Sequence, residues 1–184
     1  MSLPKPLRSP YLRWGLLALI QLALIAVPLA DRLQVQMQGQ EVVLNLRPVD
    51  PRDLLRGDYV IINLEISRVE KTLPGADQGL KSGETVYVGL DISADGVARP
   101  MKIARTRDEA GALAIAGRIG YGSADQVQID YDIDAFYLPE GTGREIERLP
   151  AKRVQAVVAV HPDGRALPLR LLVDGEEFKS DAAF

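Results

Sequence analysis

A charge-free apolar stretch near the N-terminus is the first clear pattern along the chain. Trp14–Ala30 contains no Asp, Glu, Lys or Arg, and Gln21 is its one strongly polar member. A helix of these 17 residues would span about 25 Å, close to the thickness of a bilayer core. The stretch has no polar face, which argues against a helix of a soluble domain. We therefore predict a transmembrane anchor at residues 14–30.

The residues beside this stretch predict how it sits in the membrane. A cleaved signal peptide is the alternative, but cleavage after Ala30 would place Pro28 at position −3, where a small residue is needed. A retained anchor is therefore the favoured interpretation. Residues 1–13 carry three basic residues and no acidic one, so we expect a cytoplasmic basic tail and an exported remainder of the chain.

After the anchor, apolar and polar residues alternate with a period of two, which is the pattern of half-buried β-strands. Eight segments alternate or form short apolar runs between turn signals: 42–46, 60–67, 86–92, 98–105, 112–119, 127–137, 154–160 and 167–173. Residues 33–38 also alternate, and they fit either a further strand or a helix that continues out of the membrane. This number of short strands predicts a mainly β chain with one all-β sandwich or barrel-like domain. We place that domain at residues 31–178, followed by a short tail at 179–184.

Turns that contain glycine separate several of these strands. Asp95-Gly96 and Pro162-Asp163-Gly164 each stand between two predicted strands and indicate β-hairpins. Lys81-Ser82-Gly83 is a further turn signal, and we expect residues 75–83 to form an exposed loop. The all-β interpretation therefore rests on turns as well as on alternation.

Composition narrows the chemistry available to this chain of 184 residues. The absence of cysteine excludes disulfides, thiolate metal sites and a cysteine nucleophile. The single histidine, His161, lies beside the predicted turn at 162–164, and we expect it to be exposed. Outside residues 1–13, 19 basic residues face 25 acidic ones, so the β domain suits neither nucleic acid nor anionic lipid as a partner. No cofactor and no metal site is predicted.

A segment rich in arginine and aspartate separates the strands predicted at 42–46 and 60–67. Three arginines and three aspartates fall between Arg47 and Asp58. Arginine and aspartate can pair and lock a turn, so one interpretation is a structural crossover loop. The other is a docking surface on a rigid scaffold. Its candidate residues are Arg52, Arg56, Gly57, Asp58 and Tyr59.

A second candidate segment follows the strand predicted at 127–137. Two glycines flank Thr142, and a loop of this kind exposes backbone amides that can hold an anion. Three nearby glutamates would repel a phosphate, so a glycine turn that closes the strand is the other interpretation. The candidate residues are Tyr137, Glu140, Gly141, Gly143 and Glu145. We expect this segment to lie near the first one.

Three aspartates precede the second segment at alternate positions. On a straight strand, Asp130, Asp132 and Asp134 share one face at spacings of about 7 Å. A calcium ion needs six or more oxygens that converge on one point. The spacing therefore predicts a solvated acidic face and not a metal site.

At both candidate segments the sequence resembles a family of bacterial membrane-anchored proteins named after the signature Gly-Asp-Tyr-x-x-Leu-x-Tyr. The stretches that carry the resemblance are Val49–Tyr59, Phe136–Glu147 and Leu171–Glu176. Ile62 stands where the signature has leucine, and Leu64 stands where it has the last tyrosine. The resemblance implies a companion of multi-spanning membrane proteins, and it implies no particular activity.

A weaker similarity bears on whether the chain is an enzyme. Pro51-x-x-Leu54-x-x-Gly57-Asp58-Tyr59-Val60 resembles the strand beside the nucleophile of type I signal peptidases. In that family a serine lies a few residues earlier, whereas residues 47–49 of this chain are Arg, Pro and Val. A serine nucleophile of this kind also needs a lysine base beside it, and nothing in the sequence places a lysine next to this segment. We therefore predict no catalytic residue.

These patterns together predict a non-enzymatic, single-pass protein of the bacterial inner membrane with its N-terminus in the cytoplasm. The β domain is expected in the periplasm, docked on a multi-spanning membrane partner through both candidate segments. One alternative is a signal-peptidase-like or carboxylate-dependent hydrolase, which would need grouped acids from these segments in a cleft. A ligand-binding sensor that uses the glycine loop is the other alternative, and it requires a pocket there.

Overall fold

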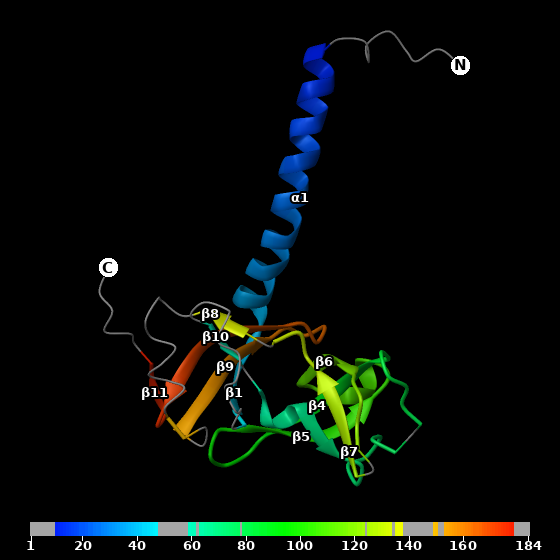
Figure 1. Cartoon of the computed structure of the whole chain (residues 1–184), viewed down its shortest axis with the longest axis vertical. Coiled ribbons are helices and arrows are strands. Elements are labelled where there is room, and N and C mark those ends of the chain that lie inside the picture. Colours follow the sequence, from blue (N-terminus) through cyan, green and yellow to red (C-terminus); the bar gives the residue numbers. More distant parts are fainter. Residues whose placement is uncertain are drawn as a thin grey trace.

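The computed structural model consists of one long helix that rises from a β domain (Figure 1). It describes residues 10–47, 59–61, 63–77, 79–123, 125–133, 135–137, 149–150 and 153–178. Helix α1 runs from Pro10 to Gln38 and is long and apolar enough to cross a membrane. No described part of the chain buries its apolar window, so that window is available to lipid or to another protein.

The helix continues past the predicted anchor, and the strand interpretation of residues 33–38 is wrong. Val35 is only 5% exposed, whereas Leu33 and Met37 are 47% and 82% exposed. The alternating residues therefore share no buried face. A helix that has already formed gains one hydrogen bond for each residue added, and Leu, Gln and Met are good helix formers. These local preferences extend α1 to Gln38.

Eleven strands lie among the described residues. The first sheet has the order β1-β9-β10-β11, with β1 at Gln40–Asn45, β9 at Val154–Val160, β10 at Ala166–Val173 and β11 at Glu176–Glu177. The second has the order β3-β7-β6-β4-β5, with β3 at Arg68–Glu70, β7 at Gln126–Asp130, β6 at Ala114–Ile119, β4 at Thr85–Ile92 and β5 at Ala98–Ala104. A small third sheet pairs β2 at Tyr59–Ile61 with β8 at Ala135–Tyr137. The predicted mainly β fold with an N-terminal apolar helix is confirmed.

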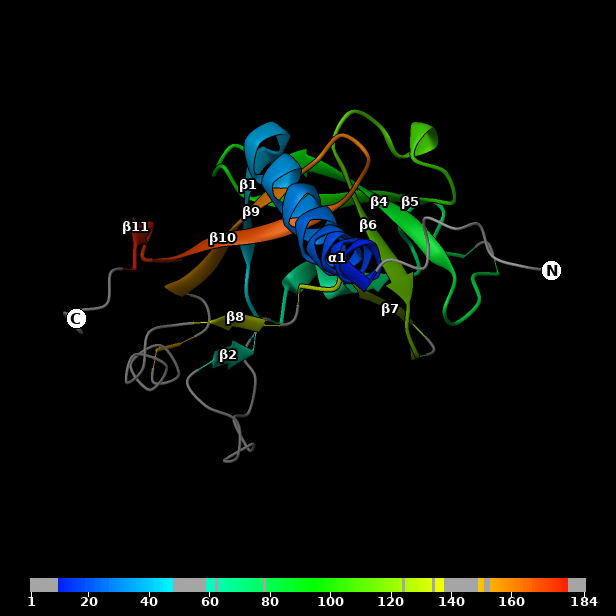
Figure 2. The ribbon, with the colours of Figure 1, turned by 90° about the horizontal axis from the view of Figure 1, so that it is seen from above.

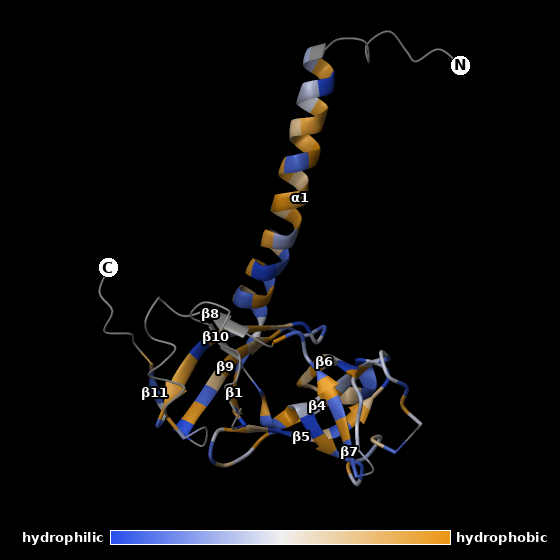
Figure 3. Cartoon of the chain, viewed as in Figure 1, coloured by the Kyte–Doolittle hydropathy of each residue, from blue (hydrophilic) through white to orange (hydrophobic). Residues whose placement is uncertain are grey.

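The two larger sheets share one hydrophobic core. Leu44 of β1, Ile115 of β6 and Leu171 of β10 are at most 2% exposed and belong to one cluster of packed side chains. Hydrophobic residues cover most of the length of α1, whereas they interleave with hydrophilic residues along the strands (Figure 3). The β domain therefore buries alternate residues, while the helix presents its apolar surface outward.

The segment at 60–67, predicted as one strand, is only partly extended. β2 ends at Ile61, and a short 3-10 helix, η2, occupies Glu65–Ser67. Leu64 makes an isolated antiparallel bridge with Leu46 and is 1% exposed. Ile66 is also buried. Alternate residues therefore reach the core through a bend and not along a single strand.

The strand predicted at 127–137 is wrong as a single strand, because it is divided between two sheets. β7 ends at Asp130 and β8 begins at Ala135. Between them, Asp132 has a φ of +55°, and its backbone N–H donates to Asp130 Oδ1 at 3.0 Å. The predicted shared face of the three aspartates is therefore broken at this bend. Asp130 and Asp132 are exposed, and Asp134 lies outside the described residues.

The predicted hairpins are confirmed. β4 and β5 are joined at Gly96, which has a φ of +79°, and β9 and β10 at Gly164, which has a φ of +97°. Asp174 and Gly175 make a further tight turn between β10 and β11. Both have positive φ, as a type I′ turn requires. Local turn chemistry therefore explains three of the strand connections.

Tyr131 ties the bend after β7 to η2, and its replacement should destabilise the fold. Its hydroxyl donates to the Ile66 carbonyl at 2.9 Å, and the residue is 6% exposed. Tyr131→Phe leaves that carbonyl without its donor, so we expect the free energy of unfolding to fall by about 1–2 kcal/mol. Urea unfolding of the full chain in detergent measures this. The matched control is Tyr121→Phe, because Tyr121 is 89% exposed.

The buried Tyr131 hydroxyl should also make the fold less stable at alkaline pH. Burial raises the pKa of Tyr131 above the usual tyrosine value of about 10. At higher pH the unfolded chain loses this proton first, so stability is complete below about pH 10 and falls as the pH rises. Tyr131→Phe should make the fall shallower, and Tyr121→Phe should not. Equal slopes in both variants would contradict this account.

Candidate functional site

The two candidate segments meet in the small sheet. Tyr59 of β2 pairs with Tyr137 of β8, followed by Val60 with Phe136 and Ile61 with Ala135. Tyr59 begins β2 and Tyr137 ends β8, so these two residues lie at the same end of an antiparallel ladder. The structure thus brings together the last candidate residue of the first segment and the first candidate residue of the second.

The remaining candidates lie outside the described residues. They are Arg52, Arg56, Gly57, Asp58, Glu140, Gly141, Gly143 and Glu145. Only the backbone of Tyr59 and Tyr137 is described. The docking role of all ten residues therefore stays a prediction.

The small sheet lies at the end of the β domain from which α1 rises. Figure 1 shows β8 at the level of the base of α1, and Figure 2 shows β2 and β8 side by side and set apart from that base when the molecule is viewed from above. A membrane crossed by α1 would therefore face the same end of the domain as this sheet. The fold places the meeting point of the two segments at the end of the β domain from which α1 rises and not at the opposite end.

The turn between β9 and β10 holds the C-terminal part of α1. Arg165 forms an ion pair with Asp31 at 3.2 Å and also donates to Gln34 Oε1 at 3.3 Å. Near the end of the helix, Val35 is buried and Gln38 Oε1 lies 3.3 Å from His161 Nε2. The helix is therefore attached to the domain by packing and by hydrogen bonds as well as by the chain itself.

His161 is buried, so its predicted exposure is wrong. It is 8% exposed, and its Nδ1 lies 2.8 Å from Asp163 Oδ1. The residue is covered because α1 continues to Gln38 and lies over the turn. Gln38 is 123 positions away in the sequence. No local pattern around a lone histidine could have indicated this contact.

The charges of this turn stabilise one another. Partial burial opposes the ionisation of Asp163, but hydrogen bonds from the Arg165 backbone, from His161 and from the Arg165 guanidinium lower the pKa of Asp163 on balance. The Asp163 carboxylate in turn raises the pKa of Arg165, with a smaller contribution from Asp31. A lowered carboxyl pKa stabilises the fold above the usual aspartate range and stops doing so as the pH falls through the folded pKa. The Asp163–Arg165 ion pair at this junction therefore weakens in acid.

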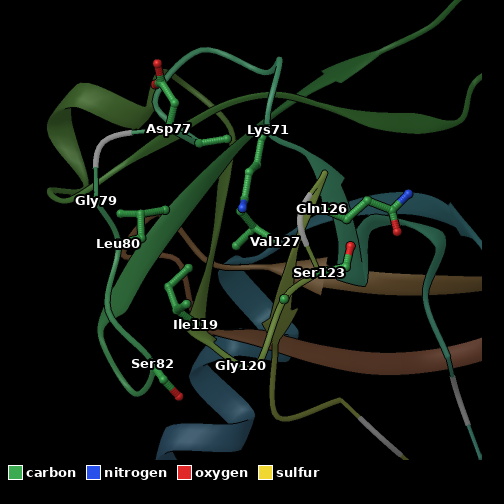
Figure 4. A pocket seen from close by; sticks show the side chains of 12 residues that line it. Lys71, Asp77, Gly79, Leu80, Ser82, Ile119, Gly120, Ser123, Gln126 and Val127 are labelled. Carbon is green, nitrogen blue, oxygen red and sulfur yellow. The ribbon is translucent and has the colours of Figure 1, made fainter.

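A pocket of about 350 Å³ opens between the 71–83 loop and strands β6 and β7. The apolar part of its lining consists of Leu80, Ile119 and Val127. Figure 4 shows the Lys71 side chain extending toward the middle of the pocket. Ser123 adds a hydroxyl at the rim. The lining therefore combines apolar and polar side chains, as the pockets that bind small molecules do. No described lining residue belongs to either candidate segment, so this is not the pocket that the glycine-loop sensor requires.

Several of the described carboxylates are held in ion pairs with arginine side chains. A hydrogen bond from Arg170 lowers the pKa of Glu41, and one from Arg153 lowers the pKa of Asp174. A general acid shows the opposite shift. Within the described part of the chain, no three His, Cys, Asp or Glu residues are grouped as metal ligands would be.

Comparison with known proteins identifies one match. A family model described as "GDYXXLXY protein" matches residues 21–171. The matched region begins inside α1, includes both candidate segments and ends in β10. No curated protein and no solved structure shows detectable similarity to the chain. The match therefore spans helix and β domain together.

Proposed function

The chain belongs to the GDYXXLXY protein family, and we propose that it is a membrane-anchored accessory subunit without enzymatic activity. Its β domain docks on a multi-spanning partner at the periplasmic face of the bacterial inner membrane. The two candidate segments, which meet at the β2–β8 sheet, form the contact surface.

The helix and its flanking charges support the anchoring and the orientation. α1 contains a window apolar enough to cross a membrane. Basic residues concentrate in 1–13, and positive charge favours the cytoplasmic side. The β domain then lies outside the cytoplasm.

The position of the β2–β8 sheet is the single observation that carries the proposal. The sheet lies at the end of the domain from which α1 rises (Figure 1). Residues 31–38 extend the helix by about 12 Å beyond the predicted apolar span. A surface at this end would stand close to the membrane, within reach of the short extramembrane loops of a multi-spanning protein.

Charge favours a protein partner over the lipid surface. The exported part of the chain carries more acidic than basic residues, so anionic headgroups would repel it. The segment at 47–58 nevertheless concentrates three arginines, and guanidinium groups bind carboxylates in a bidentate geometry. Arg52 and Arg56 would pair with acidic side chains in the partner's loops.

Purification of the full chain from native membranes in mild detergent tests the proposal. Mass spectrometry should find a multi-spanning protein that co-elutes in stoichiometric amounts. Arg56→Ala combined with Asp58→Ala should reduce its recovery by about tenfold or more, as expected for central contacts of an interface. Thermal unfolding of the β domain should change little.

A second double variant controls for the loss of surface charge. Asp95 and Arg99 form an exposed ion pair at 2.7 Å beside the β4–β5 turn. Such pairs contribute little to stability, so Asp95→Ala with Arg99→Ala should retain the partner. The proposal is wrong if the wild-type chain elutes alone. It is also wrong if both double variants lose the partner equally.

A further inference from the structure

The middle of the membrane span contains a polar side chain that the described chain does not cover. Gln21 lies one residue from the centre of Trp14–Ala30 and is exposed. The apolar window around it is not buried by any described part of the protein. In hydrocarbon, an amide without partners leaves two donors and one acceptor unsatisfied. Lipid tails supply neither an acceptor nor a donor to pair with them.

Pro28 adds a second polar group to the same side of the helix. It lies inside α1, and proline has no N–H to donate to the carbonyl four residues earlier. The Leu24 carbonyl thereby loses its usual helical donor. At about 100° per residue, Leu24 and Pro28 lie within about 60° of Gln21 around the helix axis. One side of the span therefore presents an unpaired amide and a freed carbonyl.

This polar side is continuous with the side that holds the β domain. Val35, which is buried at the junction, lies within about 40° of Gln21 around the axis of a straight helix. Figure 2 shows that the C-terminal end of α1 lies near one edge of the domain and that the helix leans across the domain toward its N-terminal end. A helix packed against Gln21 would therefore stand above the β domain.

That geometry disfavours a second copy of this chain as the occupant. Two copies related by a twofold axis would face each other through Gln21, at a helix separation of about 8–10 Å. Each β domain would then occupy the space through which the other helix reaches its own domain. A helix that ends near the membrane surface meets no such obstacle, and helices of multi-spanning proteins end in this way.

We propose that the face formed by Gln21 and the Leu24 carbonyl binds a transmembrane helix of another, multi-spanning protein. That helix carries a hydrogen-bond donor near the middle of the bilayer, such as a serine, threonine, asparagine or glutamine side chain. This inference rests on the proposed function, because it assigns a second contact to the same partner. Amide side chains commonly join helices within membranes in this way.

Photo-crosslinking in native membranes tests the inference with the full chain. A photoreactive phenylalanine analogue replaces Leu17 or Leu24 on the Gln21 side, and Leu19 or Ala26 on the opposite side. Adducts should form from positions 17 and 24 and map by mass spectrometry to a transmembrane segment of another protein. Positions 19 and 26 should give at least fivefold fewer protein adducts.

Substitutions at Gln21 show whether the amide is responsible. In the chain that carries the probe at position 17, Gln21→Leu should reduce the yield of the adduct by roughly tenfold. This is near the upper end of what an interhelical hydrogen bond contributes to association. Gln21→Asn keeps an amide and should restore part of it. Gln21→Leu makes the span more apolar, so membrane insertion is preserved, and Ala26→Leu controls for added volume on the opposite side.

Several outcomes would overturn the inference. They are adducts to lipid alone, equal adducts from both sides, adducts to a second copy of this chain, and adducts unaffected by Gln21→Leu. If a partner co-elutes through Arg56 and Asp58 but the probes capture no helix, only this inference fails. If the probes capture a helix while the Arg56 and Asp58 variant keeps the partner, the proposed docking surface fails instead.

Discussion

Replacing Gly75 with alanine should lower the free energy of unfolding by about 3 kcal/mol or more. Gly75 has a φ of +86°, and a Cβ there would overlap the Ile103 carbonyl oxygen of β5. The left-handed conformation costs roughly 1–2 kcal/mol for a residue with a Cβ, and overpacking adds about 1–3 kcal/mol. The overlap cannot relax easily, because the Ile103 N–H also donates to the Pro74 carbonyl at 2.8 Å. Thermal unfolding of the full chain in detergent should show a Tm lowered by about 6–12 °C.

Gly83 provides the matched control for this variant. Its φ of +83° is almost the same, but a Cβ added there would meet no atom within 4 Å. Gly83→Ala should therefore cost only the conformational part, about 1–2 kcal/mol. Equal losses in the two variants would show that the approach to β5 contributes nothing. The comparison separates backbone conformation from packing of the 71–83 loop, which also forms one wall of the pocket around Lys71.

The elements predicted best are those whose signals are local. β4, β9 and β10 follow apolar runs between turns, and the hairpins at Gly96 and Gly164 follow short turn sequences. Alternation and turn chemistry both act over a few residues, so a single sequence carries them in full. The mainly β architecture could therefore be predicted before any pairing was known.

The errors occur where an alternation of apolar and polar residues is compatible with more than one local structure. Residues 33–38 alternate as a strand does, but α1 continues through them and packs Val35 against the domain. At the end of β7, the alternation of buried residues continues through Tyr131 and Ile133 although the chain bends at Asp132. Alternate burial is compatible with a bend when the core lies on the inside of it. Periodicity alone cannot distinguish these cases.

In the candidate site, the sequence indicates the segments, whereas the contacts between distant residues follow only from the fold. Composition and the family resemblance indicated two segments, but only strand pairing shows that Tyr59 lies opposite Tyr137. The contact of His161 with α1 had no signal in the sequence, because it depends on where the helix ends. The sequence alone shows Gln21 as the one strongly polar residue of the predicted anchor. On a straight helix it lies on the same side as Val35, which is buried at the junction with the β domain.

Replacing Gly39 with valine should weaken the connection between α1 and the β domain. Gly39 follows α1 directly, and a Cβ there would lie 2.5 Å from the Val35 carbonyl oxygen and 3.0 Å from Ala159 Cβ. The Gly39 N–H also donates to that Val35 carbonyl at 2.8 Å, so the helix end would have to move. We expect a loss of about 2–3 kcal/mol, typical of an overpacked site. Thermal unfolding and hydrogen exchange at residues 35–39 measure the loss and its location.

The control for Gly39→Val is Gly15→Val, which lies inside α1. No atom lies within 4 Å of a Cβ at Gly15, so this variant should cost less than about 1 kcal/mol. If the junction sets the height and direction of the β2–β8 sheet, Gly39→Val should also reduce recovery of the membrane partner although Arg56 and Asp58 are intact. Full recovery of the partner together with increased exchange at residues 35–39 would contradict this. The docking surface would then tolerate a mobile domain, and the rigid continuation of α1 would matter for stability alone.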